Sequence, residues 1–294
     1  MKNNLQGVMS AIVTPFYQGE VDYESLTQLV KYQIKSGLQG LVVNGTTAES
    51  PTLSKDEVIK IFRHIRALVG DKFPLILGTG SNSTVHSIEM TKLAGDLGAD
   101  AALVVVPYYN KPTQKGLIAH FKAIAEASQI PIVLYNVPGR TITAMTADTI
   151  AELSKHKNIL CIKEASGDIS FFENIKSSAQ SDFTFLSGDD LTYLDFLDKG
   201  GHGIISVMSN LLTAETVRWT ELVKNKNLTE ASRHFEKYKK LVQLMYCEAN
   251  PIPIKWMLFK KGLIKSPEMR LPLTTLDEKF HAEILTEMKK LEII

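Results

Sequence analysis

The sequence predicts a (β/α)8 TIM barrel followed by a C-terminal helical extension. Short apolar runs recur along the chain, and each is followed by a turn and a segment of helical periodicity. The runs carry few charges and do not alternate polar with apolar residues, which is typical of strands buried on both faces of a parallel sheet. Eight such runs are present, at Val8–Val13, Gly40–Val43, Leu75–Leu77, Ala101–Val106, Ile132–Tyr135, Ile159–Ile162, Phe183–Leu186 and Gly203–Val207.

The segments between these runs have apolar residues at helical spacing. Ser25–Ser36 and Ser54–Val69 are the clearest examples, since their apolar residues fall on one face of a helix. Ser54 and Glu57 have the spacing of a capping box, in which each side chain pairs with the backbone N–H of the other residue. We therefore expect a helix to start directly after Ser54.

A closed barrel fits this pattern better than an open, doubly wound sheet, because the first run ends in Thr14-Pro15-Phe16 and lacks a GxGxxG turn. We assign residues 1–225 to the catalytic barrel and residues 226–294 to a C-terminal helical domain. Three helices are predicted in that domain, at Thr229–Ala249, Pro251–Leu263 and Thr275–Leu291.

Composition narrows the classes of function. The net charge of +1 gives no electrostatic reason to expect nucleic acid or an anionic membrane as a partner. Cys161 and Cys247 form no CxxC pair, which fits a reducing cytoplasm. The polar start at Met1–Gln6 and the short apolar runs predict neither a signal peptide nor a membrane span. The histidines lack metal-site spacing, so no metal is expected.

Lys163 is the most notable candidate, because it stands at the end of a buried strand. Catalytic groups of barrels lie where the strands end. Desolvation there favours the neutral amine, which is the form that attacks a keto acid to make an imine. The alternative is a lysine that reaches solvent or pairs with Glu164.

Two further candidates, Tyr135 and Arg140, lie at and just after the end of the preceding apolar run, Ile132–Tyr135. The hydroxyl of Tyr135 could relay protons at the same site, although a buried tyrosine is more often a core residue with a satisfied hydroxyl. Arg140 follows a rigid Val-Pro-Gly turn, where a guanidinium could bind a carboxylate in bidentate fashion. The alternative for Arg140 is a solvated surface residue.

Two further loops follow strand ends. Thr46 and Thr47 come after Gly45, and their hydroxyls and the N–H groups of the turn could cradle a carboxylate. The alternative is a polar loop with local turns. Gly188 precedes Asp189 and Asp190, one of which we expect to cap the next helix.

Taken together, these segments resemble the dihydrodipicolinate synthase / N-acetylneuraminate lyase family. The stretches that match are GTTAES at 45–50, PYYNKP at 107–112, YNVPGRT at 135–141, IKEASGD at 162–168, LSGDD at 186–190 and GGHGIISV at 200–207. The resemblance continues through residues 250–256 and 270–273, so it covers nearly the whole chain. Each motif is moderately specific, but their order and spacing are highly specific.

The resemblance implies roles for individual residues. Lys163 matches the Schiff-base lysine, and Thr46, Tyr135 and Tyr109 match the proton-relay triad. Tyr109 would enter the site of a neighbouring subunit, which implies a homo-oligomer, at least a dimer and often a tetramer formed as a dimer of dimers. The residues that match pyruvate-site positions are Thr47, the backbone of Ile205, and Gly188.

Arg140 separates the subfamilies. In the synthase pattern, the matching arginine binds the carboxylate of L-aspartate 4-semialdehyde, which condenses with pyruvate in the first committed step of diaminopimelate and lysine biosynthesis. The imine on Lys163 is the only covalent group implied, with no cofactor. Two alternatives stay open, namely an aldolase acting on a sugar acid or hydroxy-keto acid, and a catalytically idle metabolite-binding barrel.

The sequence departs from the family pattern at the positions that are linked to feedback inhibition by lysine. Family members that lysine inhibits carry His and Glu residues around an interface cleft, whereas the matching positions here are Lys55, Val58 and His86. Ser50, Asn82 and Tyr108 are retained. Because the ammonium of a lysine effector requires a carboxylate partner, we expect weak or absent inhibition.

Overall fold

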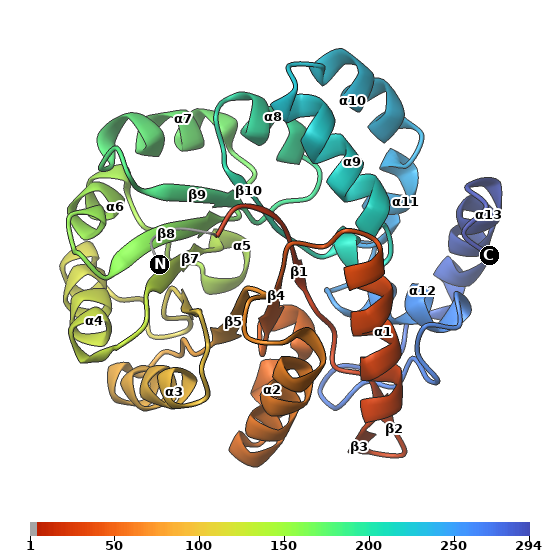
Figure 1. Cartoon of the computed structure of the whole chain (residues 1–294), viewed down its shortest axis with the longest axis horizontal. Helices are drawn as coiled ribbons and strands as arrows, with labels where there is room; N and C mark the ends of the chain where they lie inside the picture. The colour runs from red at the N-terminus through yellow and green to blue at the C-terminus, as the bar shows by residue number, and fades with distance from the viewer. Residues whose placement is uncertain (1–4) are drawn as a thin grey trace.

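Eight parallel strands close into a barrel in the computed structural model, which describes residues 5–294 (Figure 1). The order around the barrel is β1-β10-β9-β8-β7-β6-β5-β4. The strands are β1 (Gly7–Ala11), β4 (Gly40–Val43), β5 (Leu75–Gly78), β6 (Ala101–Val105), β7 (Ile132–Asn136), β8 (Ile159–Glu164), β9 (Thr184–Ser187) and β10 (Gly203–Ser206). Each coincides with a predicted run, so the predicted barrel is confirmed.

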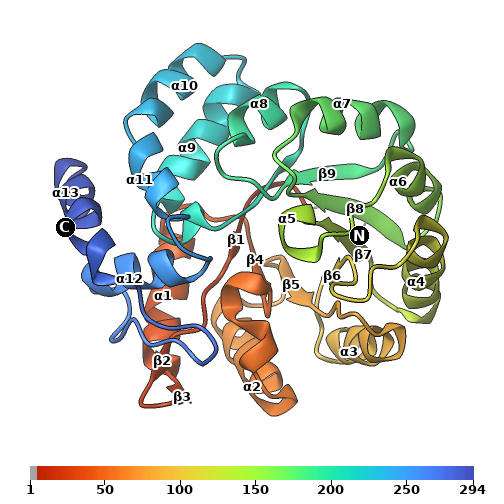
Figure 2. The same cartoon turned by 180° about the vertical axis from the view of Figure 1, so that it is seen from behind.

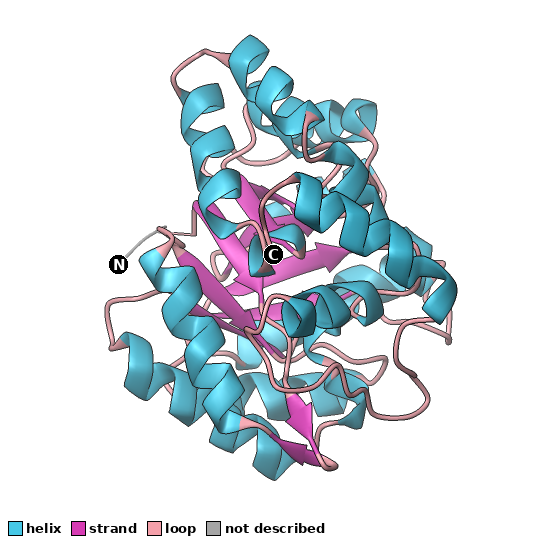
Figure 3. Ribbon diagram, turned by 90° about the vertical axis from the view of Figure 1, so that its right-hand side faces the viewer, coloured by secondary structure: helices cyan, strands magenta, loops and turns pink. Residues whose placement is uncertain are grey.

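The strands are almost fully buried because side chains fill the barrel on one face and helices cover the other. Figure 3 shows the strands enclosed by this outer layer of helices. The helices are α1 (Tyr23–Lys35), α2 (Lys55–Val69), α3 (Thr84–Asp96), α4 (Gln114–Ala127), α5 (Pro138–Thr141), α6 (Ala147–Ser154), α7 (Ile169–Ser178), α8 (Tyr193–Asp198) and α9 (Thr213–Lys224).

The helix starts follow local capping chemistry. Asp22 caps α1 by accepting from the N–H groups of Glu24 and Ser25. At the start of α2, Ser54 and Glu57 form the predicted capping box, with both reciprocal hydrogen bonds present. Short 3₁₀ turns lie in two of the loops, η1 (Thr46–Ala48) and η2 (Ser50–Thr52) after β4, and η3 (Met208–Asn210) after β10.

A small hairpin, β2 (Phe16–Tyr17) paired with β3 (Glu20–Val21), follows the first barrel strand. The sequence does not predict this hairpin, because strands of two residues give no periodicity to detect.

The C-terminal segment is helical, as predicted, but its division differs. The structure has α10 (Leu228–Glu236), α11 (Lys239–Leu244), α12 (Ile252–Lys260), η4 (Glu278–Phe280) and α13 (His281–Lys290). The single helix predicted over Thr229–Ala249 is wrong, because the chain turns between α10 and α11 at Lys237 and Tyr238. In both Figure 1 and Figure 2, α12 lies beside α1.

The turn between α10 and α11 is explained by packing around Trp219. The indole N–H donates to His234 Nδ1 at 2.7 Å. Its ring meets the rings of Phe235 and Tyr238 edge-on, at centroid distances of 5.0 and 5.5 Å. No proline or glycine lies between Leu228 and Leu244, so no helix-breaking residue accounts for the turn. The tertiary contacts with Trp219 account for it instead.

One hydrophobic cluster joins the barrel to the C-terminal helices, since it includes Val8 of β1, Leu29 of α1, Trp256 of α12 and Met288 of α13. The division into residues 1–225 and 226–294 remains a prediction. Residues 1–4 lie outside the described residues. They belong to the predicted barrel and to the N-terminal stretch in which no signal peptide is predicted.

Candidate active site

Lys163 and Tyr135 lie side by side at the C-terminal ends of two adjacent strands. They are register partners between β8 and β7. The Nζ atom of Lys163 is 4.4 Å from the centroid of the Tyr135 ring, and both residues are buried. The strand pattern thus places a primary amine against a phenol in a poorly hydrated position, as the sequence predicts.

The alternative pairing of Lys163 with Glu164 does not occur. The Glu164 carboxylate accepts from Asn136 Nδ2 at 2.7 Å and from the backbone N–H of Ser166 at 2.6 Å. Burial raises the pKa of Glu164 above its ordinary value, and the two hydrogen bonds oppose this effect. Among residues 5–294, no carboxylate forms an ion pair with Lys163, so its amine is available for chemistry.

Gly188 packs directly against the side chain of Lys163. A Cβ atom added at Gly188 would lie 2.7 Å from Lys163 Cε and 2.6 Å from Ala165 Cβ. Both contacts are shorter than van der Waals contact allows, so a glycine is required here for the observed Lys163 conformation.

Thr46 and Thr47 lie in η1, at the end of β4. Thr46 and Tyr135 line the same small cavity, whereas Thr47 is buried and its Oγ1 accepts from Asn250 Nδ2 at 3.0 Å. The phenol of Tyr135 and the hydroxyl of Thr46 border this cavity, and the amine of Lys163 lies against the Tyr135 ring. These are groups suited to imine formation and proton transfer.

Arg140 lies in α5, directly after β7, and borders the adjoining larger cavity of about 590 Å³. Its Nη2 donates to the backbone carbonyl of Asn250 at 3.2 Å. Asn250 therefore connects Arg140 to Thr47. No role for Asn250 was predicted from the sequence, although it lies in the stretch 250–256 that carries the family resemblance.

Tyr109 does not join this group. Its side chain is 90% exposed and its backbone has a left-handed φ of 74°. It borders a separate surface hollow together with Arg140 and Ile142. The structure of the single chain thus places Tyr109 beside Arg140 but outside the Lys163 site.

The remaining predicted residues lie on β9, β10 and their loops. Ile205 is buried in β10, in register with Met9.

Neither Asp189 nor Asp190 caps α8. Asp189 Oδ1 accepts from the N–H groups of Leu191 and Thr192 ahead of the helix. Asp190 Oδ2 accepts from the N–H of Met208 at 2.7 Å and from the Tyr246 hydroxyl at 2.6 Å. The capping prediction is wrong because Asp190 instead joins two loops.

The larger cavity contains four of the predicted effector-cleft residues, Ser50, Asn82, His86 and Tyr108. Lys55 and Val58 do not line it, and Val58 is buried in the core. Among the described residues that line this cavity, none is an Asp or a Glu. The nearest acid to His86 is Glu89, whose carboxylate lies 3.9 Å from His86 Nδ1.

Within residues 5–294, no group of three or more His, Cys, Asp or Glu side chains is placed to hold a metal ion. None of the helices in that range is long and apolar enough to cross a membrane.

A sequence model of the dihydrodipicolinate synthetase family matches residues 4–291. The chain belongs to the dihydrodipicolinate synthetase family. The family resemblance seen in the sequence motifs is thereby confirmed. A curated family member, the 4-hydroxy-tetrahydrodipicolinate synthase of Bdellovibrio bacteriovorus, is 48% identical over 291 residues, which cover 99% of each chain.

Solved structures of the dihydrodipicolinate synthetase family have the same fold. The chloride-inhibited dihydrodipicolinate synthase of Acinetobacter baumannii, in complex with pyruvate, matches with a TM-score of 0.96 and 41% identity, covering 99% of this chain and 100% of that one. A monomeric dihydrodipicolinate synthase variant matches with the same TM-score and identity, covering 98% and 97%.

Proposed function

We propose that this chain condenses pyruvate with L-aspartate 4-semialdehyde, the reaction of the 4-hydroxy-tetrahydrodipicolinate synthases. This reaction is the first committed step of diaminopimelate and lysine biosynthesis, and it takes place in the cytoplasm. The pairing of Lys163 with Tyr135 is the observation that carries the proposal. The identity of 48% to a curated synthase over nearly the whole chain supports the choice of reaction.

Lys163 supplies the nucleophile. Its amine attacks the keto carbon of pyruvate and water leaves, which gives an imine. Loss of a proton from the methyl group converts the imine into an enamine, whose terminal carbon attacks the aldehyde. The amine of the second substrate then attacks the imine carbon, closes the ring and releases Lys163. No cofactor is required, because the imine itself serves as the electron sink.

Protons move through Tyr135, Thr46 and Tyr109. Tyr135 and Thr46 border one cavity within the chain. Tyr109, which is almost fully exposed here, is contributed to the site of a neighbouring subunit. Ile142 is 75% exposed beside it, and together they form an apolar surface suited to contact with a second copy. The active form is therefore an oligomer, either a dimer or a tetramer built from two dimers.

Substrate carboxylates are bound at two places. Thr47 and the backbone of Ile205 hold pyruvate, and Gly188 leaves room for the Lys163 side chain. Arg140 binds the carboxylate of L-aspartate 4-semialdehyde at the rim of the larger cavity. Its hydrogen bond to Asn250 orients the guanidinium before the substrate arrives.

A coupled assay with a panel of aldehydes tests the reaction. Pyruvate should react with L-aspartate 4-semialdehyde far faster than with sugar aldehydes, and Arg140→Ala should raise KM for the semialdehyde by about tenfold or more. Arg63→Ala is the matched control, because Arg63 is exposed and lies on α2. A preference for a sugar aldehyde would instead identify an aldolase.

A further inference from the structure

Glu49 is a buried glutamate in the loop that carries Thr46 and Thr47, and no catalytic role accounts for it. It lies between η1 and η2, is 2% exposed, and has a left-handed φ of 58°. Its backbone N–H donates to the carbonyl of Thr46 at 3.1 Å. The position of Glu49 and the position of Thr46 are therefore coupled through one hydrogen bond.

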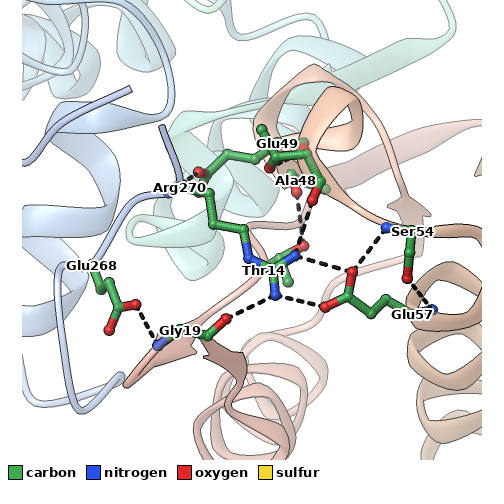
Figure 4. Close-up of polar contacts among 9 residues, drawn as sticks. Thr14, Gly19, Ala48, Glu49, Ser54, Glu57, Glu268 and Arg270 are labelled. Carbon is green, nitrogen blue, oxygen red and sulfur yellow. Dashed lines mark hydrogen bonds and ion pairs between the residues drawn. The ribbon is translucent and has the colours of Figure 1, made fainter. Parts of the chain in front are cut away.

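In the part of the chain that the structure describes, the hydrogen-bond partners of the Glu49 carboxylate all lie in the C-terminal segment. Oε1 lies 2.7 Å from Nζ of Lys255, a residue of α12 with no exposed surface. Oε2 accepts from the backbone N–H of Arg270 at 3.1 Å. Figure 4 shows Glu49 and Arg270 meeting where the C-terminal ribbon reaches the loop after β4. The ion pair of Glu49 with Lys255 joins residues that are 206 positions apart in the sequence.

The partners of Glu49 are themselves fixed in place. Lys255 Nζ also donates to the carbonyl of Glu268, and it lies 4.3 Å from the centroid of the Phe16 ring. The Arg270 guanidinium is likewise 4.3 Å from that centroid and forms a bidentate ion pair with Glu57. The loop after β4 therefore contacts Lys255 and Arg270, whose side chains are each held by further contacts.

The C-terminal segment also contacts the two loops to which substrate binding is assigned, the loop of Thr46 and Thr47 and the turn of Arg140. Asn250, five residues before Lys255, donates from its side chain to Thr47 and accepts from Arg140 at its backbone carbonyl. A buried ion pair often adds little net stability compared with apolar residues of equal volume, and in some proteins its role is instead to fix the relative geometry of the segments that carry it. This combination fits a positioning role.

We propose that Glu49, paired with Lys255, is a positioning residue that holds the Thr46–Thr47 loop in the geometry required for pyruvate binding. The proposal rests on the function proposed above and deepens it. A weakened pair lets the loop move away from the cavity while the barrel stays folded. Displacement of Thr47 raises KM for pyruvate, whereas simple loss of folded enzyme lowers kcat and leaves KM unchanged.

Four variants test this proposal, namely Glu49→Asp, Glu49→Gln, Lys255→Met and the double variant Glu49→Gln/Lys255→Met. Glu49→Asp keeps the charge but shortens the reach. The double variant removes both charges, so neither is left buried and unpaired. For each, KM for both substrates, kcat and the melting temperature are measured. Glu57→Gln is the control, because it weakens the same cluster at Arg270 without touching the loop carboxylate.

We expect Glu49→Asp and the double variant to raise KM for pyruvate about tenfold, with a smaller change in KM for the semialdehyde. The double variant should melt above either single charge-removing variant, yet keep the raised KM. Glu57→Gln should melt lower than the unmodified chain with unchanged KM values.

An unchanged KM for pyruvate in Glu49→Asp and in the double variant would overturn the proposal, and so would failure of all four variants to fold, since the pair would then be purely structural. Failure of the proposed function would appear separately, as absence of a pyruvate adduct and of synthase activity in the unmodified chain.

Discussion

Tyr135 and Lys163 are register partners on adjacent strands, and the lysine Nζ lies 4.4 Å from the centroid of the tyrosine ring. Side chains at one register level of adjacent parallel strands point to the same face of the sheet. Here that face is the interior of the barrel at its C-terminal end. The backbone geometry alone therefore brings together the proposed nucleophile, Lys163, and the proposed proton donor, Tyr135.

Tyr135→Phe should lower kcat by about 100-fold or more, because it removes the hydroxyl that transfers protons while retaining the ring against Lys163. The measurement is steady-state kinetics in the coupled assay. Tyr193→Phe is the control, since Tyr193 is also buried and, among residues 5–294, its hydroxyl bonds to Thr220 alone. The control should cost about 1 kcal/mol of stability with kcat retained. Full activity in Tyr135→Phe would exclude the hydroxyl from the mechanism.

Gly188→Ala should lower kcat about 10- to 100-fold, because its Cβ would collide with Lys163 Cε and Ala165 Cβ and displace the amine. Circular dichroism should show an intact fold. Gly95→Ala on α3 adds the same methyl group in ordinary van der Waals contact with Ile130, at 3.9 Å, and it should change kcat little. Equal activity of the two variants would show that Lys163 tolerates the displacement.

Lysine at submillimolar concentration should leave the rate unchanged. The larger cavity has no Asp or Glu among the described residues that line it, so an ammonium group finds no carboxylate there. His86→Glu should introduce lysine inhibition, whereas His86→Gln, which adds no charge, should not. Strong inhibition of the unmodified chain by lysine would contradict this assignment.

Glu57→Gln should destabilise the chain by about 1 kcal/mol at neutral pH, because it removes the ion pair with Arg270 while glutamine preserves the capping box with Ser54. The hydrogen bond from Arg270 lowers the pKa of Glu57 from 4.5 to about 2. A carboxyl group with a lowered pKa contributes its stability above pH 4.5 and loses it as the pH falls toward about 2.

Urea unfolding of both proteins across that pH range checks this prediction. The difference in the free energy of unfolding should be constant above pH 4.5 and should shrink toward zero near pH 2. A difference that does not change with pH would show that the ion pair is not its source.

The barrel strands could be predicted because strands buried on both faces leave continuous apolar runs, as at Gly40–Val43. The hairpin of Phe16–Tyr17 with Glu20–Val21 was too short to leave such a pattern. The break near Tyr238 was also hidden, since amphipathic periodicity continues across it and the contacts with Trp219 come from another helix.

The positions of Lys163 and Tyr135 were predictable because each residue lies at the end of a strand. Their catalytic roles stay predictions. Glu49, Asn250 and Lys255 were missed because their partners lie more than a hundred positions away, and no local spacing reveals such contacts. Tyr109 could not be placed in the Lys163 site from the single chain, where its side chain points to solvent.

Borohydride reduction in the presence of pyruvate, followed by peptide mass analysis, shows directly whether Lys163 forms the imine. Reduction converts an imine into a stable secondary amine and thereby marks the lysine that forms it. We expect the pyruvate-derived mass on the peptide that carries Lys163, and its absence from Lys163→Ala. A label on another lysine, or no label in the unmodified chain, would contradict the account.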